Sequence, residues 1–159
     1  EGKSRSGKTL TAAALPASQG DAGKAAALYG KAIDESPCVV EAYLELYELH
    51  KARKDFNAAA ELLERLKKVK PDFEKAYLLL GYVYFTQKMR GPRKLHIERA
   101  LENLKMAVAL NPDNFDACYS ISEIYHYIKK DDEARTWEEK GRQVEERIDG
   151  ARGPDRRPE

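Results

Sequence analysis

Cysteine and histidine are scarce in this chain of 159 residues, which contains two cysteines and three histidines. Two cysteines are too few for a framework of disulfide bonds, and Cys118 lies in an apolar helical pattern where a small buried thiol is expected. His50, His96 and His126 do not have the close spacing that zinc ligands need. The sequence therefore predicts neither a disulfide-stabilised domain nor a metal site, and no cofactor is expected.

The sequence also lacks a long apolar run and an excess of charge of one sign. No stretch approaches the roughly 18 apolar residues of a membrane-spanning helix. Because 28 basic residues face 27 acidic ones, the net charge of +1 disfavours nucleic acid as a partner. The N-terminus has no apolar signal segment, which favours the cytoplasm, although the sequence begins at Glu1 and a removed signal segment stays open. We expect a protein or peptide partner, and the oligomeric state stays undetermined.

What the sequence does contain is a repeated helical pattern. Proline follows an apolar helical segment at Pro37, Pro71 and Pro112, at intervals of 34 and 41 residues. A small residue stands twelve positions before each proline, and large or apolar residues recur between these marks. The period is therefore 34 residues, with an insertion of seven residues in the third repeat. The recurring small residues are Ala25, Ala59, Ala100 and Ala134.

A helix–turn–helix period of 34 residues resembles the tetratricopeptide repeat. The resemblance rests on Leu80, Gly81 and Tyr84 in the first helix of the third repeat, and on Ala100, Leu104, Ala107 and Pro112 in its second. It covers about four repeats between residues 6 and 148. The resemblance implies an all-α fold, a right-handed solenoid of antiparallel helix pairs. We expect a flexible basic tail over residues 1–9, the repeat domain over 10–149 and a disordered tail over 150–159.

The segment 59–84 is the most regular junction between two repeats. Two apolar stripes at helical spacing flank the turn at Pro71, because proline disfavours helical geometry in the residue before it. One helix pair cannot bury its stripe alone, so stacked repeats build the core. The pattern predicts that these residues point inward: Ala59, Leu62, Leu63, Leu66, Ala76, Tyr77, Leu80, Gly81 and Tyr84.

The segment Gly2–Thr9, GKSRSGKT, matches the pattern of a phosphate-binding loop. That motif binds phosphate when a buried strand delivers the glycine-rich turn to a helix N-terminus. Only Glu1 precedes Gly2, so the sequence supplies no such strand. We interpret this segment as a solvated basic tail.

The insertion in the third repeat is strongly basic, and it includes Arg90, Arg93 and Lys94. Its seven residues form either a loop or about two further helical turns. A functional reading is contact with an acidic partner or a phosphate backbone. The structural reading, which we favour, is a solvated bulge at the edge of a repeat.

The resemblance also implies a binding groove on the concave surface, formed by the first helices of successive repeats. Aromatic and acidic residues at the groove positions suit an apolar or aromatic peptide that carries positive charge. A packing role against the next repeat accounts equally well for Tyr82, Tyr119 and Tyr127. The predicted groove residues are Leu44, Glu48, Lys51, Leu78, Tyr82, Phe85, Tyr119, Glu123, His126 and Tyr127.

The sequence thus predicts a non-catalytic protein-interaction module, an adaptor or assembly factor. A structural subunit, packed through its convex face, its ends or the basic insertion, is the alternative. The family's clamp for the C-terminal carboxylate of chaperones is disfavoured, because its lysine and asparagine positions hold Leu44, Glu48, Leu78 and Tyr82, and only Lys75 fits. No pairing of nucleophile and base that would indicate an enzyme is visible.

Overall fold

The computed structural model of the protein describes residues 22–87 and 93–152, which form seven helices and contain no strand. The chain divides between Pro71 and Asp72 into two compact units. We call them the N-terminal unit and the C-terminal unit and describe each by itself. The segment Gly2–Thr9, which matches the pattern of a phosphate-binding loop, and Arg90 lie outside the described residues.

The N-terminal unit consists of α2 (Ala22–Glu35), α3 (Val40–Ala52) and α4 (Phe56–Val69), and α3 packs against both other helices. Asp55 caps α4, since its side chain accepts a hydrogen bond from the Ala58 amide at 3.2 Å. Proline follows the helix at Pro71, as the sequence pattern predicts. The buried apolar residues are Ala25, Tyr29, Ala32, Ile33, Ala42, Tyr43, Leu46, Tyr47, Ala59, Ala60, Leu62, Leu63 and Leu66.

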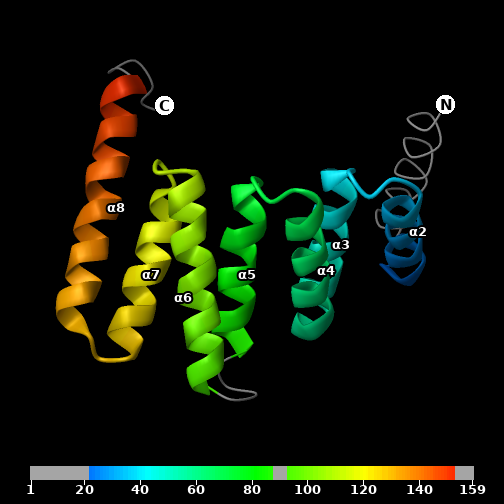
Figure 1. The fold of residues 1–159 in the computed structure, drawn as a ribbon, viewed down its shortest axis with the longest axis horizontal. Coiled ribbons are helices and arrows are strands. Elements are labelled where there is room, and N and C mark those ends of the chain that lie inside the picture. The colour runs from blue at the N-terminus through cyan, green and yellow to red at the C-terminus, as the bar shows by residue number, and fades with distance from the viewer. Residues whose placement is uncertain (1–21, 88–92, 153–159) are drawn as a thin grey trace, which may run out of the picture. The chain divides into compact units, whose positions relative to one another are not determined.

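The C-terminal unit consists of α5 (Glu74–Gln87), α6 (Arg93–Leu110), α7 (Phe115–Tyr127) and α8 (Asp131–Arg152). Consecutive helices run in opposite directions (Figure 1), and α5 packs on α6, α6 on α7 and α7 on α8. Its buried apolar residues are Ala76, Tyr77, Leu80, Val83, Tyr84, Ile97, Ala100, Leu104, Ala107, Val108, Ala117, Cys118, Ile121, Ile124, Ala134 and Val144. The inward residues predicted for segment 59–84 are therefore confirmed.

Gly81 lets α5 and α6 approach closely. A Cβ atom built on Gly81 would lie 2.4 Å from Leu104 Cγ and 2.7 Å from Leu104 Cδ2. Leu104 is itself almost fully buried. The glycine therefore makes the space that the leucine side chain fills.

The insertion in the third repeat lengthens the second helix of that repeat. The interval of 41 residues places the counterpart of Phe56, where α4 begins, at Ile97, yet α6 begins at Arg93. Four of the seven inserted residues thus form about one extra helical turn. The prediction left loop and helix open, and the structure assigns this part to helix.

The two short turns from α3 to α4 and from α7 to α8 have the same backbone conformation. Each contains a lysine in the left-handed region, Lys54 with φ 58° and Lys129 with φ 61°. Each lysine follows the C-cap residue of the preceding helix, Arg53 for α3 and Ile128 for α7. The second turn leads into α8, which continues to Arg152 and so passes the expected domain boundary at residue 149.

Candidate functional site

The groove residues predicted in the second repeat lie on α3, in the N-terminal unit. Leu44 is partly buried there, and Glu48 and Lys51 are exposed. Lys51 Nζ forms an ion pair with Glu48 Oε2 at 2.6 Å and lies 5.5 Å from the centre of the Tyr47 ring. These two charges thus neutralise each other within a single helix.

The remaining predicted groove residues belong to the C-terminal unit, where several of them meet between α5 and α7. We call this surface the α5/α7 surface. It comprises Leu78, Tyr82 and Phe85 of α5 and Asp116, Ser120, Glu123 and Tyr127 of α7. The helical repeat places each set on one side of its helix, because residues three, four and seven positions apart share a face.

Tyr82 connects the two helices of this surface and is partly buried. Burial raises the pKa of its phenol, and the nearby carboxylates of Asp116 and Glu123 raise it further, while a hydrogen bond with Ser120 lowers it. The Ser120 hydroxyl also donates a hydrogen bond to the backbone carbonyl oxygen of Asp116 at 2.8 Å. The Tyr82 ring thus lies among polar groups of α7 and stays neutral near pH 7.

Phe85 and Tyr127 form an aromatic pair at one end of the α5/α7 surface. Their ring centres are 5.7 Å apart and the rings meet edge to face. The Arg93 guanidinium, at the start of α6, lies 6.0 Å from the centre of the Tyr127 ring. Tyr127 is 37% exposed, which places it among the three most exposed large apolar side chains of the described residues.

The charged groups of α7 on this surface are both acidic. Asp116 and Glu123 are exposed, and neither belongs to an ion pair within residues 22–87 and 93–152. Lys75, two turns before Tyr82 on α5, is the exposed basic residue at the other end of the surface from Arg93. The carboxylates of Asp116 and Glu123 both raise the pKa of the Tyr82 phenol, so the surroundings of this side chain are acidic.

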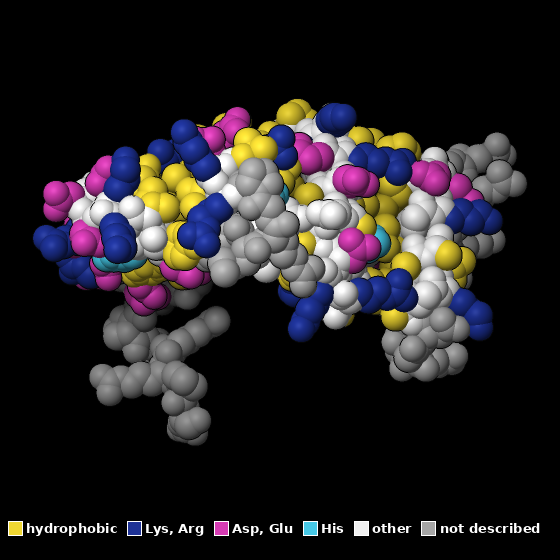
Figure 2. All heavy atoms as spheres, turned by 90° about the horizontal axis from the view of Figure 1, so that it is seen from below, with side chains coloured by type: hydrophobic (Ala, Val, Ile, Leu, Met, Phe, Trp, Pro, Cys, Tyr) yellow, Lys and Arg dark blue, Asp and Glu magenta, His cyan; other side chains and the backbone are white. Residues whose placement is uncertain are grey.

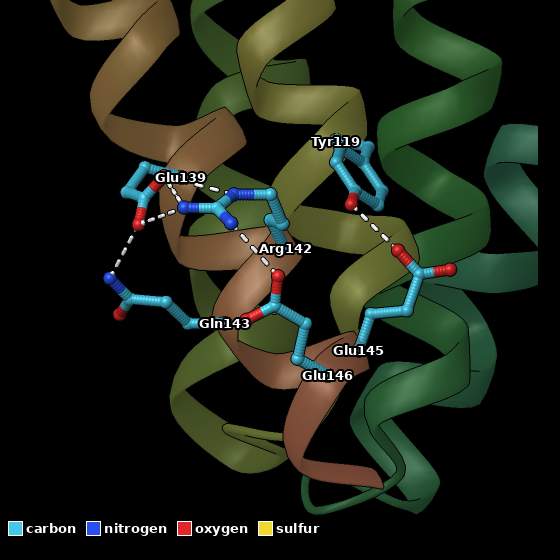
Figure 3. A network of polar contacts seen from close by, with 6 residues as sticks. All are labelled: Tyr119, Glu139, Arg142, Gln143, Glu145 and Glu146. Carbon is cyan, nitrogen blue, oxygen red and sulfur yellow. Dashed lines mark hydrogen bonds and ion pairs between the residues drawn. The ribbon is translucent and has the colours of Figure 1, made fainter. Parts of the chain in front are cut away.

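Tyr119 points to α8 and not to the α5/α7 surface. Its hydroxyl donates a hydrogen bond to Glu145 Oε2 at 2.8 Å, as Figure 3 shows, and its ring lies 3.1 Å from a Cβ built on Gly141. Near Tyr119 on α8, Arg142 donates hydrogen bonds to Glu139 and Glu146, and Gln143 donates one to Glu139 (Figure 3). Tyr119 therefore contacts the second helix of its own repeat, and not a neighbouring repeat.

His126 also has a partner at the junction of α7 and α8. Its Nδ1 atom lies 3.1 Å from Asp131 Oδ1, and both side chains are about half exposed. Of the predicted basic insertion residues, Arg93 contacts Tyr127, and Lys94, which is 91% exposed, pairs weakly with Glu98 at 3.9 Å. In the described part of the insertion, Arg93 therefore contacts the α5/α7 surface and Lys94 is solvated.

Charges of both signs occur together on one face of the molecule. On the face drawn in Figure 2, lysine and arginine side chains are interspersed with aspartate and glutamate. None of the described helices is both long and apolar enough to cross a membrane. Within the same residues, no three histidine, cysteine or acidic side chains gather in a way that could hold a metal ion.

Sequence reasoning missed the role of Ser120 and the partners of Tyr119 and Tyr127. Ser120 lies one turn before the predicted groove residue Glu123, so a helical projection places the two residues on the same face of α7. That signal was present in the sequence. The contact of Arg93 with Tyr127 could not be predicted from the sequence, because it depends on how far α6 extends into the insertion.

Comparisons with known proteins agree with this architecture. Residues 17–84 match the family model of the tetratricopeptide repeat. A crystal structure of MamA matches with a TM-score of 0.77 and 21% identity over 91% of this chain and 81% of that one. MamA residues 41 to the end from Desulfovibrio magneticus RS-1 match with a TM-score of 0.71 and 19% identity over 89% of this chain and 76% of that one.

A thermophilic protein of the same repeat type, TTC0263 from Thermus thermophilus, matches with a TM-score of 0.68. It is 21% identical, over 89% of this chain and 75% of that one. No curated protein sequence matches the chain. At these identities the structural likeness establishes the fold, and it does not carry a partner across.

Proposed function

The chain is built from tetratricopeptide repeats in an all-α fold, and on that premise we propose that it binds a segment of a partner protein along its groove helices. The repeat is typically a non-catalytic scaffold for protein interactions, and we extend this to an adaptor or assembly factor without enzymatic activity. The observation that supports the proposal is the α5/α7 surface, where Tyr82, Phe85 and Tyr127 are partly exposed side by side.

Aromatic side chains provide a large contact area at a low cost in conformational entropy, and they dominate the energetics of many interfaces. Leu44 and the Glu48–Lys51 pair on α3 are the predicted groove positions of the N-terminal unit, and we propose them separately as a contact region of that unit.

One observation favours the alternative, a structural subunit packed through its convex face. Leu95 and Met106 are each 40% exposed on α6. They stand 11 residues apart, about three helical turns, and therefore share a face of α6. A partner that packs on this face would bury both side chains.

A pair of matched variants distinguishes the two functions. Partners captured by the wild-type chain are identified by mass spectrometry, purified, and titrated against Tyr82→Ala with Phe85→Ala and against Leu95→Ala with Met106→Ala. We expect the first variant to weaken binding at least about tenfold, because aromatic anchors are typical hot spots. The second should bind like wild type, and circular dichroism should show the same helix content for all three.

The opposite pattern, loss of binding only in the Leu95 and Met106 variant, would support the structural subunit. If both variants bind the partner as tightly as the wild type does, both functions are contradicted. These outcomes are separable because the two pairs of side chains lie on different helices.

A further inference from the structure

We infer that the segment bound by the α5/α7 surface is basic, and that it places an arginine or lysine beside Tyr82, between Asp116 and Glu123, with an apolar or aromatic residue against Phe85 and Tyr127. This inference rests on the proposed function and specifies the chemistry of its partner.

The first step concerns the two carboxylates. Asp116 and Glu123 are seven residues apart on α7, two helical turns or about 10.5 Å along the axis. Both are exposed and outside any ion pair of the described chain, whereas several exposed carboxylates of α8, such as Glu133, Glu139 and Glu146, have a basic partner. A cation from outside the chain would therefore meet two uncompensated charges.

The second step concerns Tyr82. Its phenol forms a hydrogen bond with Ser120, which lies four residues after Asp116 and three residues before Glu123 on α7. Aromatic faces attract guanidinium and ammonium groups. A guanidinium there can contact the ring, donate paired hydrogen bonds to one carboxylate and be attracted by the charge of the other. An acidic side chain at the same place would meet only repulsion.

The third step concerns the neighbouring aromatic pair. Phe85 follows Tyr82 by three residues on the same face of α5, about 4.5 Å further along the axis. Arg93 lies against Tyr127 and supplies positive charge at that end, while Lys75 supplies it at the other. The surface is therefore acidic in its middle and basic at its two ends, which fixes where the cation of the partner binds.

Panning a phage-displayed library of random short peptides against the full chain tests the inference. We expect the selected peptides to carry arginine or lysine next to a phenylalanine, tyrosine or leucine. In titrations with a selected peptide, Asp116→Asn with Glu123→Gln should weaken binding about tenfold, because charge-assisted hydrogen bonds are lost. Glu102→Gln, which removes an exposed carboxylate of α6, should leave binding unchanged.

Two outcomes would overturn the inference. In the first, the selected peptides no longer bind the variant Tyr82→Ala with Phe85→Ala, but they contain no excess of basic residues or are rich in acidic ones. They also bind the variant Asp116→Asn with Glu123→Gln as tightly as the wild type. The proposed function then stands and the partner chemistry is wrong. In the second, no selected peptide depends on Tyr82 and Phe85, and both the proposed function and this inference are wrong.

Discussion

The Leu104 side chain fills the space that the missing side chain of Gly81 leaves in the C-terminal unit. The effects of substitutions at these two positions on the free energy of unfolding should therefore depend on each other. Gly81→Ala places a Cβ atom 2.4 Å from Leu104 Cγ, and overpacking of this kind costs about 1–3 kcal/mol in the free energy of unfolding. Leu104→Ala alone should cost about 2–5 kcal/mol through the cavity it leaves. The double variant should lose clearly less than the sum, because the alanine at 81 then has room.

Chemical denaturation measures these differences, and Gly30→Ala is the control. Nothing lies within 4 Å of a Cβ built on Gly30, in the interior of α2. That substitution should stabilise the protein by up to about 1 kcal/mol, since alanine has the higher helix propensity. Additive losses at positions 81 and 104 would contradict the shared space.

The two cysteines should differ in reactivity. Cys118 is fully buried, and burial raises the pKa of its thiol, so little thiolate is present at neutral pH. Cys38 is exposed in the turn between α2 and α3. With iodoacetamide and mass spectrometry, we expect rapid alkylation of Cys38 and slow alkylation of Cys118 until denaturant is added. Equal rates in the native protein would show that α7 and α8 do not enclose Cys118.

At the scale of elements, Asn114 joins two helices of the C-terminal unit. Its Oδ1 atom accepts a hydrogen bond from the Ala117 amide at 2.9 Å and caps α7, and its Nδ2 atom lies 3.5 Å from Glu74 Oε1 at the start of α5. Asn111 Nδ2 donates to the same glutamate oxygen at 3.2 Å. The turn before α7 is thereby held to the first turn of α5.

Asn114→Ala should therefore destabilise the protein by about 1 kcal/mol, the usual cost of a lost N-cap. Asn114→Ser keeps a capping oxygen and removes only the bond to Glu74, so its loss should be smaller. Thermal unfolding followed by circular dichroism measures both. Losses of equal size would mean that the cap of α7 contributes nothing.

The buried positions of each helix could be predicted from the sequence because helical periodicity alone decides which residues share a face. Ala59, Leu63 and Leu66 illustrate this, and all three are fully buried. The start of α6 could not be predicted, since seven inserted residues fit a loop and a helix equally well. The orientation of the Tyr119 side chain could not be predicted either, because its partner Glu145 lies 26 residues away on another helix.

At the scale of the whole molecule, charge should contribute little to stability. The net charge is +1, and the ion pairs among the described residues are accessible to solvent, many of them within one helix. Exposed pairs contribute about 0–1 kcal/mol each and are screened by salt. We expect the free energy of unfolding to change by less than about 1 kcal/mol between about 0.1 M and about 1 M sodium chloride.

Peptide binding should respond differently, because the proposed contact unites opposite charges of two molecules. The dissociation constant of a selected peptide should rise over the same range of salt while the unfolding midpoint stays nearly constant. A large loss of stability in salt would indicate that the surface pairs carry more of the fold than their exposure implies.

The extra turn of α6 bears on the modularity of the chain. Repeats of equal length can be exchanged, duplicated or shuffled, since each contacts its neighbours through the same positions. A second helix of regular length would begin near Ile97 and would not include Arg93, whose guanidinium contacts Tyr127 in the following helix pair. Replacing this repeat by a copy of a shorter one would keep the periodic core and remove that contact. The contact between Arg93 and Tyr127 therefore exists only where the longer repeat is followed by the fourth one.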